Sequence, residues 1–164
     1  MSVPHWFILL VILQRLLELA VSRRNTTRLL KQGAIEVGAG HYPLIVVLHV
    51  AWLAAMWLSV TPETQLLWPW LGIYVLLACG RVWVMTTLGR FWTTRIIHLP
   101  DAPLVRRGPY RFCRHPNYLI VAGEIAIVPL ALGQWPVAII FSVLNAMALA
   151  WRIRIENAAL ATRM

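Results

Sequence analysis

Long apolar runs separated by short polar stretches dominate the chain. The four clearest runs cover residues 43–60, 66–88, 118–132 and 135–151. The run at 43–60 has no formal charge, and the run at 66–88 is interrupted only by Arg81. Because about 20 apolar residues cross a bilayer as a helix, each run predicts a membrane-spanning helix.

A fifth run extends from Val3 to about Val21 and contains two charged residues, Arg15 and Glu18. These residues are three apart, so they share one helix face and could pair inside a bundle. The alternative is a signal peptide, because Ala20-Val21-Ser22 resembles a cleavage site. The basic residues that normally precede such an apolar stretch are missing, which favours a fifth membrane helix.

The longest stretch outside the runs covers residues 89–117 and contains Pro100, Pro103 and Pro109. Several fixed φ angles favour an ordered loop over a flexible linker. The sequence therefore predicts an all-α integral membrane protein. It forms one domain over residues 1–164, a bundle of about five transmembrane helices with a structured connector between the third and fourth.

Composition supports a membrane protein. Hydrophobic residues make up 60% and charged residues 13%, against about 25% charged in soluble domains. A disordered chain and a soluble globular one are therefore disfavoured. The 15 Lys and Arg against 6 Asp and Glu give a net charge of +9, which by itself also suits a nucleic-acid binder.

The placement of the basic residues decides between these two classes. All but Arg15 and Arg81 follow the first run, fill the connector or lie at the C-terminus. With five spans these three segments share one side of the membrane. The positive-inside rule then places the N-terminus outside and the C-terminus in the cytosol. Since the charge is explained by topology, no nucleic-acid partner is expected.

The connector ends in a segment dense in functional residue types, residues 108–118 (GPYRFCRHPNY). Pro116 suits the first turn of the fourth helix. The free N–H groups there, with His115, Arg111 and Arg114, predict a site for a carboxylate or a phosphate. The alternative is that the two arginines are interfacial anchors that contact lipid phosphate.

A second constellation lies at the end of the last run. Asn145, Leu149, Arg152 and Glu156 are spaced by four, three and four residues, so they form one helical stripe. The alternatives are structural: a helix-stabilising Arg152–Glu156 pair, and an interhelical hydrogen bond from Asn145.

Other polar residues have weaker signals. Glu124 lies mid-span, where an ionisable group is functional or paired, and the best candidate partner is Arg81. For His41 and His49 we expect polar packing, with cavity lining as the minority alternative. Cys79 and Cys113 lack the spacing of a disulfide or a zinc site, so no metal is expected.

These motifs together resemble the isoprenylcysteine carboxyl methyltransferase family of membrane enzymes. The resemblance rests on Leu104-Val105, Gly108-Pro109-Tyr110, Arg114-His115-Pro116-Asn117-Tyr118, and Arg152 with Glu156. It covers about residues 67–160, which would be the methyltransferase core (the last three helices and the connector). Residues 1–66 would form an N-terminal helical hairpin similar to the short bacterial branch of the family, so the bacterial inner membrane is the expected location.

The resemblance implies S-adenosylmethionine as cofactor, bound between the connector and the last two helices. By the same resemblance the cofactor site would be lined by Leu104, Val105, Tyr110, His115, Pro116, Asn117, Tyr118 and Glu156. Arg152 and Glu156 would be the catalytic residues, and Arg152 with Asn145 would bind the substrate.

The implied function is methylation of a carboxyl or hydroxyl oxygen on a lipophilic substrate at the cytosolic interface. Asn157 follows Glu156 where the family often has a second acid, which leaves the identity of the acceptor open. The alternatives are a phospholipid N-methyltransferase, a membrane reductase with a similar helical core, and a non-enzymatic membrane protein.

Overall fold

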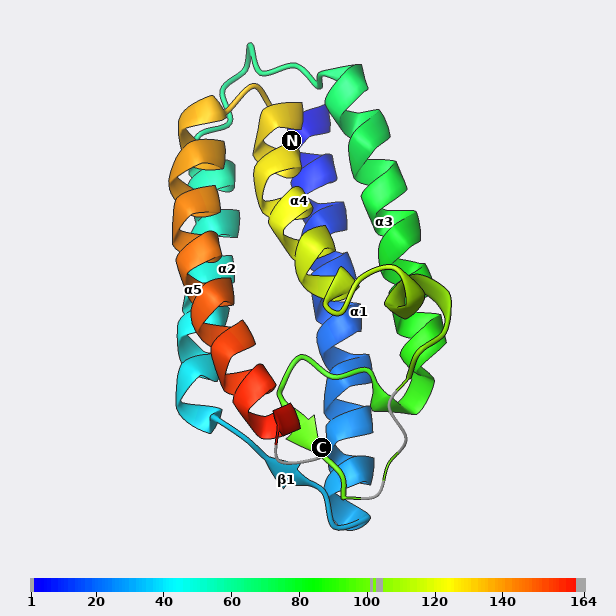
Figure 1. Cartoon of the computed structure of the whole chain (residues 1–164). Helices are drawn as coiled ribbons and strands as arrows, with labels where there is room; N and C mark the ends of the chain where they lie inside the picture. The colour runs from blue at the N-terminus through cyan, green and yellow to red at the C-terminus, as the bar shows by residue number, and fades with distance from the viewer. Residues whose placement is uncertain (1, 101, 103–104, 162–164) are drawn as a thin grey trace.

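In the described part of the chain, five α-helices run alternately up and down (Figure 1). The computed structural model describes residues 2–100, 102 and 105–161. The helices are α1 (Val3–Lys31), α2 (Tyr42–Leu58), α3 (Trp68–Leu88), α4 (Pro116–Ala131) and α5 (Trp135–Ala161). The predicted all-α bundle of about five helices is confirmed.

Two helices are longer than their apolar runs predict. The first continues about ten residues past Val21, and the last continues past Trp151 to Ala161. A helix can continue beyond its apolar residues, and it ends where the backbone adopts a conformation that is not helical. In α1 that conformation occurs at Gly33, with φ 88°, where the N–H of Ala34 returns to the carbonyl of Leu29.

Among the described residues, three helical segments are long and apolar enough to cross a membrane: Val3–Lys31, Trp68–Phe91 and Trp135–Asn157. The other two are apolar but shorter, with 17 residues in α2 and 16 in α4. Pro116 fixes the start of α4, as the sequence predicted. As a result, α4 begins partway along its neighbours, and the connector folds into the space below it (Figure 1).

The apolar core lies toward the end of the bundle where the chain begins. Ile8, Trp52, Met56, Ile125 and Val128 are almost completely buried there. The indole N–H of Trp52 donates to the carbonyl of Ile125 at 3.2 Å, which joins α2 to α4. The opposite end of the bundle is left for the connector.

The connector is ordered by contacts with the polar extension of α1. It contains η2 (Gly89–Phe91), β2 (Ile97–His98) and η3 (Gly108–Arg111). The amide of Asn25 donates to the carbonyls of Gly89 and Trp92, and Ser22 accepts the N–H of Thr94 at 2.8 Å.

A short antiparallel ladder adds a second tie between the connector and the N-terminal half. It joins β1 (Ile35–Glu36) to β2, with Ile35 opposite His98. This ladder is not detectable in the sequence, because two residues per strand leave no visible alternation of apolar and polar positions.

The charged residues inside the spans are paired. The predicted Arg15–Glu18 pair forms at 2.8 Å, and the Arg81 guanidinium contacts the Glu124 carboxylate. The ring of His49 bonds the carbonyl of Ile45 at 2.8 Å, in agreement with polar packing. The side chain of His41 lies outside the described part of the chain.

Candidate active site

A cavity of about 1050 Å³ lies where the connector meets α5. Its walls come from the connector, the beginning of α4 and the end of α5, with Leu29 of α1 and Leu88 of α3 at its edge. The predicted residues on its lining are Val105, Tyr110, His115, Asn117, Tyr118, Arg152 and Glu156. The structure thus brings together two motifs that are separated by more than 30 residues in the sequence.

Tyr118 is at the centre of the polar contacts in this cavity. Its hydroxyl accepts a hydrogen bond from Nε of Arg152 at 2.8 Å and donates one to the carboxylate of Glu156. The Arg152 guanidinium also lies 5.3 Å from the centre of the Tyr118 ring. Within the described residues, Arg152 and Glu156 are linked through this hydroxyl and make no direct ion pair, so the simple helix-stabilising pair is not what forms.

Arg152 is held from a second direction by the connector. Its Nη2 donates to the backbone carbonyl of Thr94 at 2.7 Å, and the side chain is buried. Thr94 is fixed in turn by the hydroxyls of Ser22 and Tyr42, at 2.8 and 3.2 Å from its own hydroxyl. Residues from α1 and α2 therefore determine where the guanidinium lies.

His115 and Pro116 orient the start of α4. His115 is the N-cap residue, and its ring stacks on Tyr118 with 5.3 Å between ring centres. Its Nδ1 lies 3.7 Å from the Glu156 carboxylate. Pro116 is buried and is not among the residues that line the cavity; it sets the first turn from which Asn117 and Tyr118 project.

Tyr110 and Val105 reach the cavity from the connector. Burial raises the pKa of the Tyr110 hydroxyl, and the negative charge of Glu156 raises it further. Tyr110 therefore stays protonated at neutral pH and can donate a hydrogen bond. Leu104 lies outside the described residues.

Asn145 is buried but does not line the cavity. It lies seven residues before Arg152 on α5, which is about 10 Å deeper in the bundle at 1.5 Å per residue. The stripe from Asn145 to Glu156 therefore contributes only its last turn to the cavity walls.

Several cavity residues were missed by the sequence analysis. Arg95 lines the cavity and pairs with Glu36 at 2.8 Å, while its guanidinium lies 4.4 Å from the centre of the Tyr42 ring. Trp92 also lines it, and its indole nitrogen is buried with no hydrogen-bond partner in the described structure. The only signal for either was its place in a basic, proline-rich connector.

Basic side chains are common in the cavity lining, and acidic ones are rare. Glu156 is its acid among the described residues, whereas its cationic side chains are Arg95, Arg106, Arg111, Arg114 and Arg152. An aromatic pair, His115 and Tyr118, lies beside them. Such a cavity suits a ligand that carries both charges and a planar ring.

Comparisons with known proteins identify the family of the chain. Residues 70–162 match the model of the "Isoprenylcysteine carboxyl methyltransferase (ICMT) family". The chain is 38% identical to the uncharacterized protein YpbQ of Bacillus subtilis, over 94% of this chain and 95% of that protein. It is 27% identical to an uncharacterized protein of Haemophilus influenzae, over 89% and 88% of the two chains. No solved structure matches the chain significantly. The chain therefore belongs to the isoprenylcysteine carboxyl methyltransferase family of membrane methyltransferases.

Proposed function

We propose that this protein is an S-adenosylmethionine-dependent O-methyltransferase. It acts on a carboxyl or hydroxyl oxygen of a lipophilic substrate at the cytosolic face of the membrane. The observation that carries the proposal is the Arg152–Tyr118–Glu156 constellation inside a cavity large enough for a cofactor and the reactive end of a substrate.

The residues of the cavity fit the chemical groups of S-adenosylmethionine. The Glu156 carboxylate suits the ammonium group or the ribose hydroxyls, and the arginines suit the carboxylate. The His115–Tyr118 pair offers an aromatic surface for adenine. The buried indole N–H of Trp92 is a further donor that lacks a partner among the described residues, and buried donors of this kind nearly always have one.

The chain itself has to orient the acceptor oxygen and exclude water. When bound, S-adenosylmethionine supplies a methyl group already activated by a positively charged sulfur. Arg152 donates to the acceptor oxygen from a guanidinium that Tyr118 and the Thr94 carbonyl hold in place, so little reorganisation is needed. A carboxylate acceptor needs no base, whereas for a hydroxyl the charge of Arg152 lowers the pKa of the acceptor.

The location of the cavity suits two routes of entry. It lies at the end of the bundle that carries the polar extension of α1 and the arginines of the connector. The positive-inside rule makes this end cytosolic, with the N-terminus outside, in the inner membrane of a bacterium. The polar cofactor then enters from the cytosol, and the lipophilic substrate enters from the bilayer.

Calorimetry with S-adenosylhomocysteine tests the cofactor site. We expect the purified wild type to bind it and Glu156→Gln to bind at least about tenfold more weakly, because a hydrogen bond to a charged group contributes about 1.5–3 kcal/mol. Glu63→Gln, an exposed position in the loop between α2 and α3, is the matched control and should bind like the wild type. Absence of binding by the wild type would contradict the proposal.

The product identifies the acceptor atom. Membranes supplied with methyl-labelled S-adenosylmethionine should yield base-labile methyl esters or stable methyl ethers in the lipid fraction. Label in methylated ethanolamine head groups would instead indicate N-methylation and overturn transfer to oxygen.

A further inference from the structure

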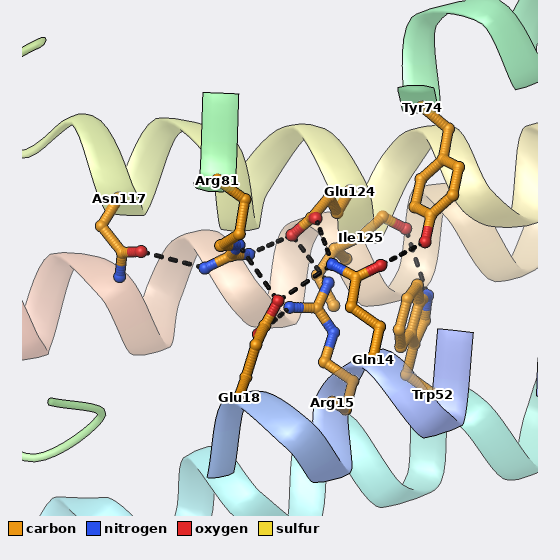
Figure 2. Close-up of polar contacts among 9 residues, drawn as sticks. All are labelled: Gln14, Arg15, Glu18, Trp52, Tyr74, Arg81, Asn117, Glu124 and Ile125. Carbon is orange, nitrogen blue, oxygen red and sulfur yellow. Dashed lines mark hydrogen bonds and ion pairs between the residues drawn. The ribbon is translucent and has the colours of Figure 1, made fainter. Parts of the chain in front are cut away.

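Four charged side chains, the buried Glu18, Arg81 and Glu124 and the half-buried Arg15, lie together in the middle of the bundle, and the proposed chemistry does not use them (Figure 2). Glu124 is completely buried, and Arg81 is 3% exposed. Arg15 contacts Glu124 at 2.7 Å and Glu18 at 2.8 Å, and Arg81 contacts Glu124 directly. Two cations and two anions cancel, but placing four charged side chains inside a membrane bundle is costly and normally serves a function.

The charge cluster extends toward the apolar core through neutral side chains. The Gln14 amide donates to Glu18 at 2.9 Å and to Glu124 at 3.4 Å, and the hydroxyl of Tyr74 donates to the Gln14 oxygen. These contacts, visible in Figure 2, hold the carboxylates of Glu18 and Glu124 on the side that faces away from the cavity.

Toward the cavity, the cluster makes a single connection. Nη1 of Arg81 donates to Oδ1 of Asn117 at 2.9 Å, and Asn117 lines the cavity. Within the described residues no other side chain of the cluster bonds to a cavity residue. Arg81 is thus the bridge between the buried charges and the cavity.

This contact fixes which way the Asn117 amide points. A guanidinium has only N–H donors, so the oxygen of the amide has to face Arg81 and the NH₂ group has to face away. That NH₂ group has no acceptor among the described residues. It is therefore available as a pre-oriented donor to a ligand in the cavity.

We propose that Arg81 is a positioning residue that acts through Asn117. The Glu124 carboxylate holds Arg81, Arg81 holds the Asn117 oxygen, and the Asn117 NH₂ group donates to an acceptor oxygen of the cofactor. The inference rests on the proposed function, since it takes the ligand of the cavity to be S-adenosylmethionine. It gives the buried charges a role in binding and not only in packing.

A matched pair of neutral variants separates this role from a structural one. Arg81→Met/Glu18→Gln and Arg15→Met/Glu18→Gln each remove one cation and one anion, and each leaves Glu124 with one arginine. Only the first removes the contact with Asn117. We expect the first to bind S-adenosylhomocysteine about tenfold more weakly by calorimetry, with KM for the cofactor raised and kcat little changed, and the second to bind within about twofold of wild type.

Adding Asn117→Ala completes the test. If Arg81 acts through Asn117, the loss caused by Asn117→Ala is not increased by Arg81→Met/Glu18→Gln. Equal weakening by both neutral variants, or losses that add, would overturn the inference while leaving the proposed function intact. A wild type that binds no S-adenosylhomocysteine would overturn both.

Asn117→Asp provides an independent check that keeps the charge cluster whole. Its carboxylate still accepts from Arg81, so thermal stability should be retained, but it presents no donor to the cavity. We expect about tenfold weaker binding of S-adenosylhomocysteine; unchanged binding would overturn the inference even if the neutral variants do not fold.

Discussion

At the scale of single residues, one oxygen atom organises the candidate site. The hydroxyl of Tyr118 joins Arg152 to Glu156. Tyr118→Phe keeps the ring under the guanidinium and removes only this link. Because hydrogen bonds to charged groups contribute about 1.5–3 kcal/mol each, we expect methyl transfer to slow by at least about tenfold, measured with labelled cofactor.

Tyr74→Phe is the control for this change. Tyr74 also lies in an apolar helix and donates its hydroxyl to a polar side chain, Gln14, but it does not line the cavity. We expect methyl transfer at nearly the wild-type rate. Equal losses in the two variants would show that either tyrosine hydroxyl acts only through the stability of the fold.

Gly108 is a residue whose missing side chain matters. It has φ 56°, and a Cβ there would lie 2.6 Å from the hydroxyl oxygen of Thr87 on α3. Gly108→Ala therefore combines left-handed backbone strain of about 1–2 kcal/mol with a steric clash. We expect a clear fall in the melting temperature of the purified protein.

Gly33→Ala separates the two costs. Gly33 also has a positive φ, 88°, but no atom lies within 4 Å of the position that its Cβ would take. Gly33→Ala should therefore be destabilised only by the backbone strain, and its melting temperature should be higher than that of Gly108→Ala. Thr87→Ala added to Gly108→Ala should recover part of the loss, and no recovery would contradict the predicted clash.

At the scale of elements, the polar extension of α1 is a support for the connector. Asn25 donates to two connector carbonyls, at 3.1 Å to Gly89 and 2.8 Å to Trp92. Asn25→Ala leaves both acceptors without this donor, at a cost of about 1–3 kcal/mol. We expect a lower melting temperature and faster hydrogen exchange at the amide of Thr94, with Asn25→Asp worse because its carboxylate faces two carbonyls.

Thr26→Val is the matched control on the next residue of the same helix. The hydroxyl of Thr26 is buried and has no hydrogen-bond partner in the described structure. Removing it should leave the melting temperature unchanged or slightly higher. A loss as large as that of Asn25→Ala would mean that any change in this turn loosens the connector.

Elements were predictable to the extent that their signals are local. Apolar runs located all five helices, and the proline at position 116 located the start of α4. The ends of α1 and α5 lie beyond the ends of the apolar runs, because hydropathy indicates which residues lie in the membrane and not how far the helix continues. The β1–β2 ladder could not be predicted, since it depends on tertiary contacts between residues about 60 positions apart.

The candidate site was predictable only where side chains carry a recognisable chemistry. Residues such as Tyr118, Arg152 and Glu156 stand in dense motifs, and the structure gathers them at one cavity. By contrast, the carbonyl of Thr94 that holds Arg152 has no side-chain signal at all. The Arg81–Asn117 contact depends on how α3 packs against α4, and the residues of the two helices do not specify that packing by themselves.

At the scale of the whole molecule, the uneven distribution of charge predicts the orientation in the membrane. The described parts of one end carry the basic residues of α1, the connector and α5, whereas the loops at the other end, residues 59–67 and 132–134, have none. The cost of moving arginine across a bilayer then favours a single orientation. In the proposed orientation, the basic end and the cavity both face the cytosol, from which the proposed cofactor would enter.

Labelling with a membrane-impermeant maleimide measures that orientation. In a Cys79→Ser background, native Cys113 of the connector should react only after cells are permeabilised, because it lies at the basic end. Thr61→Cys, in the exposed loop between α2 and α3, in a background that also has Cys113→Ser, should react in intact cells. The reverse pattern would place the cavity outside the cell, where S-adenosylmethionine is not supplied. It would then contradict both the orientation and the route of cofactor entry, while leaving the geometry of the cavity unchanged.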